Sequence, residues 1–551
     1  MMLSAILTVM LALSVPAAMS DSSKVRVSGG LESDNAVYVA DEKTGSLSEP
    51  RFGSNNWLKL DLASDHFDAG LQVEAYPEPL RGFDSGLKGA GVPFYYIRYR
   101  GGGLEVTAGS FYEQFGSGLL FRSWEDRELG HNNAVTGLHL AYSTRDDILT
   151  LKALCGLPRY CLNSVGAGEA LLAKAFSPWF GTVVGGADAS LDLGRLLGSD
   201  GATVLLEGSI LDRNERDVPA MFSFLASSGG FEIPRNVVSW SARTSLAFGA
   251  FSLKLEHVSK GADFHVDKIY RSADGYSLKR GNAQLLEADY VGGNFTASLS
   301  ARRLSNIQQD LFRSPVSGIL SNTICYVPAL CMRQTYMLAS LNPYVPNVDG
   351  EAGGQADFFY NWRRGTAIGG RYGMKLHLNG SYFWTLPQAL SNWEVARLAY
   401  RDINVELEKR WSGNFQTTLF VSIQENSPSH GDRFKTEAQN VFVLEGLYRF
   451  SKGVSLRSEL QYLYSQELSR DWMAALAELS FAPHWSFHLS DMYNHGLTRV
   501  HYYDVGASYS SGAVRMALNY GRHRAGMVCS GGVCRYQPAF TGGMLQLSYS
   551  F

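Results

Sequence analysis

Residues 111–133 combine aromatic residues with a close group of charges of both signs. The charged residues that we single out there are Glu113, Arg122, Glu125, Asp126, Arg127 and Glu128. Two carboxylates such as Glu125 and Glu128 are the kind of pair that general acid–base catalysis uses. Neither a nucleophile nor a substrate pocket is defined beside them, so the sequence predicts no catalytic residue and no enzyme.

The cysteines also have the residue type and spacing for chemistry. They form three close pairs: Cys155 with Cys161, Cys325 with Cys331, and Cys529 with Cys534. In an exported chain this spacing predicts three small disulfide loops. The alternative is a metal site, but no pair has a second CxxC or an HxxH motif nearby. We therefore favour disulfides and expect neither a metal nor a cofactor.

The elements that must position these residues are short amphipathic strands. Ile403, Val405 and Leu407 share one face of a stretch whose other face is polar, a turn follows at 412–414, and the alternation resumes with Leu419 on the apolar face. A period of two residues predicts strands with one apolar face, and tight turns between them predict hairpins. The pattern recurs through the whole chain without a linker or a change in composition.

Counting these units predicts the fold class. We expect an all-β, up-and-down antiparallel transmembrane barrel of about 24 strands, within a range of about 22–26, because an even count places both ends on one side. Residues 156–185 leave open whether a further hairpin raises the count. The longer, extracellular connections are predicted near 40–55, 77–93, 112–133, 156–185, 212–235, 261–281, 304–353, 386–399, 426–437, 466–470, 494–500 and 524–538, and the short turns are predicted to be periplasmic.

A barrel of this size predicts a role for 111–133. About 24 strands enclose a lumen that is too wide for strand side chains to fill. The segment follows the strand that carries Leu104 and Val106, loses the two-residue period and concentrates opposite charges. These features favour a segment that folds inward and forms a constriction in the lumen. The alternative is a solvated outer loop.

The start of the chain has the features of an export signal. Residues 1–20 are almost wholly apolar or small, and Ala18-Met19-Ser20 gives a small-x-small pattern before Asp21. We expect residues 1–20 to be a cleaved signal peptide and 21–551 to be a single barrel domain in a bacterial outer membrane, with both termini periplasmic. The formal net charge of −3 indicates no nucleic-acid partner.

The end of the chain is an amphipathic strand that stops on an aromatic residue. Leu545, Leu547, Tyr549 and Phe551 fall on one side of it. This arrangement resembles the terminal signal by which outer-membrane barrels are recognised, which implies the barrel assembly machinery as a partner. Strand parity further predicts that this last strand pairs with the first, near Val25–Val39, and closes the barrel.

Two motifs carry a resemblance to a family. They are the run Phe111-Tyr-Glu-Gln-Phe-Gly-Ser-Gly-Leu with the following Arg122-Ser-Trp-Glu-Asp-Arg-Glu-Leu-Gly, and the closing Cys529-Ser-Gly-Gly-Val-Cys534-Arg-Tyr. Together with the short turns, they resemble a family of uncharacterised outer-membrane barrels from Bacteroidota-type bacteria. The resemblance implies fold and location, and it transfers no site residue because the family has no established activity.

Three functions remain open at this point. The leading one is a porin-like pore or transport channel for polar solutes, narrowed by 111–133, because the inward face carries charges of both signs. The second is a non-transporting scaffold in the membrane lipid, whose disulfide-stiffened loops bind a partner protein or a surface glycan. The third is an outer-membrane hydrolase. A TonB-type transporter is disfavoured, since strands begin near residue 25 and leave no room for an N-terminal plug domain.

Overall fold

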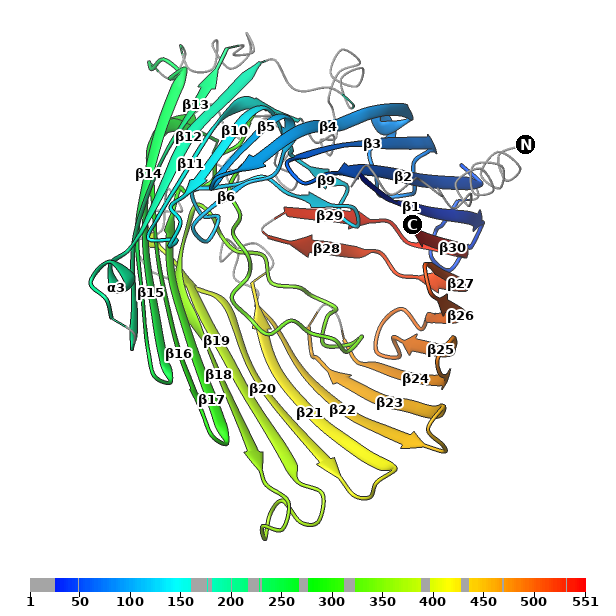
Figure 1. Cartoon of the computed structure of the whole chain (residues 1–551). Helices are drawn as coiled ribbons and strands as arrows, with labels where there is room; N and C mark the ends of the chain where they lie inside the picture. The colour runs from blue at the N-terminus through cyan, green and yellow to red at the C-terminus, as the bar shows by residue number, and fades with distance from the viewer. Residues whose placement is uncertain are drawn as a thin grey trace.

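The computed structural model describes residues 25–47, 49–159, 176, 181–199, 201–216, 227, 230–266, 276–311, 323–387, 397–427, 436–467, 470–531 and 533–551. Within these ranges the chain forms one closed antiparallel barrel of 24 strands (Figure 1). The predicted signal peptide, 1–20, lies outside them. Among the described residues, no helix has the length and apolar character needed to cross a membrane.

The strands of the barrel wall are long and follow one another in chain order. They are β1 (Arg26–Val39), β2 (Phe52–Ala63), β3 (Phe67–Glu78), β4 (Gly89–Gly101), β5 (Leu104–Phe111), β10 (Val135–Ser143), β11 (Leu149–Pro158), β12 (Thr182–Asp192), β13 (Ala202–Glu215), β14 (Asn236–Phe248), β15 (Phe251–Val266), β16 (Tyr276–Gly292), β17 (Phe295–Ser305), β18 (Gly350–Trp362), β19 (Met374–Thr385), β20 (Leu398–Arg410), β21 (Phe415–Asn426), β22 (Glu437–Arg449), β23 (Val454–Tyr464), β24 (Trp472–Phe481), β25 (Trp485–Tyr493), β26 (His501–Ser511), β27 (Val514–His523) and β30 (Phe540–Ser550).

Smaller elements lie in the connections between wall strands. They are η1 (Ser85–Leu87), β6 (Gln114–Phe115), β7 (Phe121–Arg122), β8 (Glu125–Asp126), β9 (His131–Asn132), α3 (Leu193–Leu196), β28 (Gly526–Ser530) and β29 (Val533–Gln537). We call the end of the barrel with the short connections and both ends of the wall the turn end. The opposite end, from which the long connections emerge, is the loop end.

The wall closes because the last strand returns to the first. Leu31 of β1 lies opposite Tyr549 of β30, and Gly29 and Phe551 exchange two backbone hydrogen bonds of 2.9 and 3.0 Å. An open edge would leave a row of unpaired backbone groups, which closure removes. The prediction that the last strand pairs with the first is therefore confirmed.

The predicted strand count is also confirmed. The alternation of short turns and long connections matches the prediction along the whole described chain. In the region left open, Gly156 of β11 pairs directly with Val184 of β12, so the connection between them adds no hairpin to the wall. Residues 160–175 and 177–180 of that connection lie outside the described residues.

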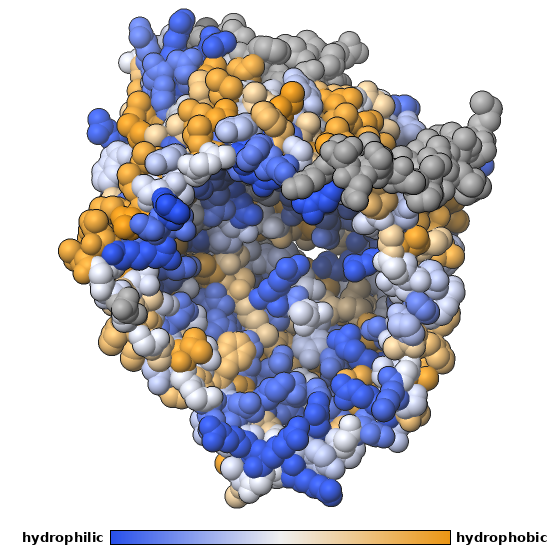
Figure 2. Space-filling view, in the orientation of Figure 1, coloured by the Kyte–Doolittle hydropathy of each residue, from blue (hydrophilic) through white to orange (hydrophobic). Residues whose placement is uncertain are grey.

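The two faces of the wall differ in polarity. Large apolar side chains are exposed on the outer face of strands around the barrel: Leu138, Ile210, Leu299, Ile403, Leu460, Leu489 and Leu518. Near the turn end, aromatic rings follow one another from strand to strand: Phe248, Phe251, Tyr290, Phe295 and Phe358. Figure 2 shows hydrophilic side chains gathered over the hollowed interior. This is the outward-apolar, inward-polar arrangement of outer-membrane-type barrels.

Many inward-facing charges pair between neighbouring strands. Arg98 contacts Glu105 at 3.4 Å, and Arg457 contacts Glu445 at 2.9 Å. Arg100 contacts Asp68 at 2.6 Å. Cross-strand pairs of opposite charge stabilise adjacent strands, and the lining they produce has both signs, as the sequence predicted.

The closing contact generates the first prediction. Deletion of Phe551 removes the two backbone hydrogen bonds to Gly29 and the ring contact with Tyr549, whose centroids are 5.7 Å apart. We expect a loss of about 2–4 kcal/mol of barrel stability. The measurement is the fraction of refolded protein that keeps heat-modifiable mobility on a gel.

Two further variants bracket this result. Phe551→Tyr keeps the backbone and the ring, and should fold like the natural chain. Gly29→Val should fail like the truncation, because a Cβ at Gly29 would lie 2.5 Å from Cζ of Phe551 and 2.6 Å from the carbonyl oxygen of Lys59. Equal folded yields for the truncated and natural chains would show that the closing contact is dispensable.

Candidate functional site

Three long connections fold from the loop end into the lumen. We call their described parts the loop plug: residues 112–134, 306–311, 323–349, 524–531 and 533–539. Figure 1 shows β6, β9, β28 and β29 inside the ring of wall strands. The plug is the candidate functional site because it contains the charged residues singled out in the sequence and packs against the inward face of the wall.

The first part of the plug is a small hairpin built from β6 and β7. Phe115 lies opposite Phe121, and the turn between them holds Gly116 and Gly118 at φ of +58° and +92°, which glycine adopts without strain. A Cβ at Gly116 would also lie 2.5 Å from Cδ of Arg243 on the wall. Glycine at this position therefore allows both the turn and its close approach to the barrel.

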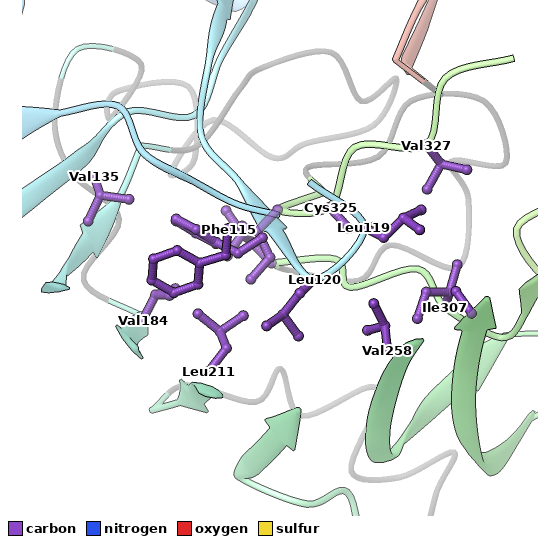
Figure 3. Packing of buried hydrophobic residues seen from close by; sticks show 14 of the residues in the cluster. Phe115, Leu119, Leu120, Val135, Val184, Leu211, Val258, Ile307, Cys325 and Val327 are labelled. Atoms are coloured by element: carbon purple, nitrogen blue, oxygen red, sulfur yellow. The ribbon is translucent and has the colours of Figure 1, made fainter. Parts of the chain in front are cut away.

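Apolar side chains fix this hairpin to the inner wall. Phe115 and Leu120 are fully buried and belong to one cluster with the inward-facing Val184, Leu211 and Val258. Figure 3 shows the Phe115 ring beside Val184, with Leu120 and Leu211 next to it. Burying a large apolar side chain contributes about 1.5–3 kcal/mol, so this cluster is the main apolar anchor of the hairpin.

Glu113 is the electrostatic anchor of the same segment. Its carboxylate contacts Nε2 of His139 at 2.7 Å and accepts a hydrogen bond from Nζ of Lys152 at 2.8 Å. Burial alone would raise the pKa of Glu113, but the hydrogen bonds from His139 and Lys152 outweigh it and hold the pKa below its usual value. Glu113 thus stays ionised and binds the segment to β10 and β11.

The other predicted charges take different partners. Arg122 lies over the ring of Tyr326, with 3.9 Å between the guanidinium carbon and the ring centroid. Glu125 accepts a hydrogen bond of 2.7 Å from Gln72, and Arg127 contacts Glu32 at 2.6 Å. These contacts attach the segment to β1, to β3 and to Tyr326 in the part of the plug at 323–349.

Asp126 and Glu128 each take part in a hydrogen bond within the plug. The carboxylate of Asp126 accepts a 3.1 Å hydrogen bond from the Leu129 N–H. The side chain of Glu128 is exposed, and its carbonyl accepts a 3.1 Å hydrogen bond from Arg535. The structure therefore brings Glu125 and Arg127 together but distributes the six charged residues along the plug, where they do not form a single ring.

A small cavity beside Glu125 bears on the catalytic alternative. It is lined by Glu74, Glu125, His131 and Arg159 among others and has a volume of about 20 Å³. A volume of this size holds about one water molecule. Arg159 closes it by binding both carboxylate oxygens of Glu74 at 2.9 and 2.8 Å. Among the described residues, this cavity is therefore too small for an organic substrate.

The second plug loop, from 306 to 349, interlocks with the first. The N–H of Arg122 donates to the carbonyl of Ile324 at 2.7 Å, and the N–H of Tyr326 donates to the carbonyl of Gly118 at 2.9 Å. Farther along, Leu338 is fully buried and packs in one cluster with Phe420, a buried residue of wall strand β21. The loop thus crosses from the first segment to the opposite part of the wall.

The third part is the β28–β29 hairpin, which a disulfide between Cys529 and Cys534 links. The N–H of Val327 donates to the carbonyl of Gly531 at 3.0 Å. Val533 is buried against Trp124 in a small apolar cluster. This hairpin therefore touches both other loops and completes the plug.

Of the three predicted disulfides, Cys529–Cys534 is confirmed. The prediction for Cys325 and Cys331 is wrong, because both are free thiols. Cys325 lies in the apolar cluster with Phe115, and Cys331 packs in a separate cluster. Burial raises the pKa of Cys331 to about 12, so it stays a thiol.

The third predicted disulfide joins Cys155 to Cys161. Cys155 is exposed on β11, and its predicted partner Cys161 lies outside the described residues. That disulfide therefore stays a prediction.

The turn-end half of the lumen differs from the plugged half. Inward-facing lysines there remain exposed to water: Lys59 at 48%, and Lys254 and Lys375 at 61% of their side-chain surface. The plug instead contacts residues such as Leu211 and Leu304, near the loop ends of β13 and β17. The lumen is therefore filled by the plug at the loop end, and its lining is exposed to solvent at the turn end.

Sequence reasoning missed the residues that seat the second loop. Arg302 and Glu351 are fully buried and paired at 3.0 Å, and Glu351 also accepts a 2.5 Å hydrogen bond from the hydroxyl of Tyr344. Both charges lie at strand ends that flank this loop, on the inward face. That position was the available signal, because a buried charge needs a partner.

His131 generates a prediction about pH. It is 1% exposed and its ring lies 4.0 Å from that of Trp124. Burial lowers its pKa from 6.5 to about 3. Between these two pH values the buried imidazole is neutral, whereas the imidazole of a released segment is protonated. The free energy that holds residues 124–133 in the folded plug should therefore fall by about 1.4 kcal/mol per pH unit as pH drops below 6.5.

Hydrogen exchange of residues 124–133, corrected for intrinsic rates, measures this effect. We expect faster exchange as pH falls from 6.5 towards 3. His131→Phe keeps a buried ring without a titrating group, so exchange in this variant should depend much less on pH. Equal pH dependence in both proteins would exclude His131 as the cause.

Comparisons with solved structures find other barrels at low identity. The P pilus usher (PapC) translocation pore has a TM-score of 0.42 and 10% identity, with 95% of this chain and 99% of that chain covered. The siderophore receptor PirA from Pseudomonas aeruginosa has a TM-score of 0.39 and 11% identity, covering 96% and 80%. The copper transporter OprC has a TM-score of 0.42 and 8% identity, covering 97% and 82%.

Comparison with curated proteins finds no match. A family model, in contrast, matches residues 1–551 from end to end, and its description is a family of unknown function, DUF6029. The expectation of an uncharacterised family is confirmed, and this chain belongs to the DUF6029 family.

Proposed function

We propose that this protein is an outer-membrane channel for polar solutes and that the loop plug is its gate. The observation that carries the proposal is the division of the lumen into a plugged loop-end half and a wet turn-end half. A barrel of 24 strands is wide enough to pass solutes once the plug moves. Its lining of paired charges of both signs gives no strong preference for anions or cations.

The outer face supports the membrane placement. Exposed leucine, isoleucine and phenylalanine side chains surround the barrel, an arrangement that water disfavours at about 25 cal/mol per Å². A closed sheet satisfies its backbone within lipid, as a spanning structure must. With short turns and both wall ends at one end, we assign the turn end to the periplasm. The Bacteroidota origin and the cleavage of residues 1–20 stay predictions.

The contacts of the first plug loop suit a gate. Its polar anchors, Glu113 with Lys152 and Arg127 with Glu32, join groups that water can solvate after release. Its ends continue directly into β5 and β10, where Phe111 pairs with Val135. The loop can therefore leave the lumen while the wall stays closed.

Conductance in planar bilayers tests the proposal. We expect the natural protein to conduct weakly or intermittently. Replacing residues 113–132 with a short Gly-Ser turn should raise conductance several-fold, because the wall hairpin of β5 and β10 remains and the plug loses its first loop. A matched replacement of residues 364–372, which lie in a turn-end connection, should leave conductance unchanged.

Silence of both the natural protein and the 113–132 variant would contradict the channel. If such a silent barrel also co-purified with a stoichiometric partner, the scaffold function would replace it. Extraction of the natural protein without detergent would contradict the membrane placement itself.

A further inference from the structure

An arginine on the outer, lipid-facing surface is held by neutral side chains. Arg303 lies on β17 two residues after Ala301 and four after the exposed Leu299, so it shares their outward face. In the register of the wall it is opposite Gln284 of β16 on one side and Ala352 of β18 on the other. Arg303 therefore projects from the barrel, away from the lumen.

The partners of Arg303 are amides. One of its terminal nitrogens donates to Oδ1 of Asn282 at 2.7 Å and to Oε1 of Gln284 at 3.3 Å. The amide of Gln284 in turn contacts Nδ1 of His257 at 3.2 Å. Within the described part of the chain, these two amide oxygens are the only side-chain partners of Arg303, and neither carries a charge.

A second outward arginine shows the contrast. Arg401 of β20 is paired with Glu425 of β21 at 2.5 Å, so its charge is neutralised within the protein. Arg303 has no such neutralisation, although an uncompensated cation facing lipid is costly. The amides orient the guanidinium and leave its charge available to an external anion.

A groove begins beside this arginine. A cavity of about 900 Å³ on the outer surface is lined by Ala301, Arg303, Ala352, Gly354, Tyr382 and Trp384 among others. A second cavity, of about 1110 Å³, lies along the same strands towards the turn end, where Ala297, Ala356 and Gly380 line it. Small side chains between large apolar ones form the floor, so the groove suits a hydrocarbon chain.

The depth of Arg303 matches a head-group position. It lies eight residues along β17 from Phe295, which belongs to the aromatic row near the turn end. With a strand tilt of about 45°, this separation corresponds to about 20 Å across a hydrophobic band about 25 Å tall. Trp384 and Tyr382 line the same cavity from β19, and aromatic residues are typical of a membrane interface. Arg303 therefore sits near the loop-end boundary of the lipid.

We propose that this surface binds a phosphate-bearing lipid of the surrounding bilayer, with the phosphate on Arg303 and an acyl chain in the groove. The guanidinium fork matches a phosphate group and can bind it through two parallel hydrogen bonds. The apolar groove that continues from the arginine favours a lipid over free phosphate. The inference rests on the membrane placement in the proposed function and is independent of channel activity.

Native mass spectrometry of the full-length protein in detergent, titrated with diphosphoryl lipid A, tests the proposal. We expect Arg303→Gln to weaken binding about tenfold or more, because a charge-assisted bond to phosphate is lost. Ala352→Leu should weaken it by filling the groove. Arg401→Gln, which changes an outward arginine that already has a carboxylate partner, is the matched control and should bind like the natural protein.

Heat-modifiable mobility on a gel shows which variants are folded, and only folded protein is compared. Unchanged binding in folded Arg303→Gln, or equal binding of lipid A without its phosphates, would overturn the proposal. Displacement of the lipid by millimolar inorganic phosphate, with no effect of Ala352→Leu, would identify a free-anion site and also overturn it. Lipid binding by a barrel that proves silent in bilayers would support this inference and contradict only the channel.

Discussion

The structure depends on one constraint: every wall strand must pair its backbone on both sides. In an apolar surrounding an unpaired N–H or C=O costs several kcal/mol, so the sheet has to end where it began. The hydrogen bonds between Gly29 and Phe551 meet this requirement. Once the sheet is closed, strand parity decides for each side chain whether it faces lipid or lumen. The outward leucines and the inward ion pairs are both consequences of that closure.

The number of strands then determines the problem that the interior must solve. A ring of 24 strands leaves a lumen that wall side chains cannot fill, so other parts of the chain must occupy it. Here the connections do so with two kinds of contact. Phe115 and Leu120 bury apolar surface on the wall, whereas Glu113 and Arg127 form polar contacts. The first kind gives the plug a defined seat, and the second kind can be exchanged for water.

The sequence predicted the wall better than the plug, for a physical reason. Alternation such as that of Ile403, Val405 and Leu407 assigns faces locally, and turns separate the strands, so the count and closure follow from short-range patterns. The interleaved charges and aromatics of 111–133 also indicated a segment that faces inward. The other two plug loops carry no comparable pattern, and Leu338, which packs on the far wall, looks in sequence like any apolar loop residue.

The cysteines illustrate the same limit. Cys529 and Cys534 lie opposite each other in an antiparallel pair, with 4.1 Å between their Cα atoms, which places their sulfur atoms within bonding reach. Cys325 and Cys331 have nearly the same spacing in sequence, but they occupy different apolar clusters. Spacing alone cannot distinguish the two cases, because the difference lies in the tertiary partners of the loop.

The position of the β28–β29 hairpin in the chain has a consequence for biogenesis. The hairpin lies between β27 and β30 in the chain. The segment that completes the plug therefore immediately precedes the strand that closes the barrel. A chain cut short before this region lacks both at once. Such a fragment lacks the strand that pairs with both β1 and β27, so the two edges that β30 joins in the complete barrel have lost their common partner. The order of the elements thus places completion of the plug and closure of the barrel in the same final part of the chain.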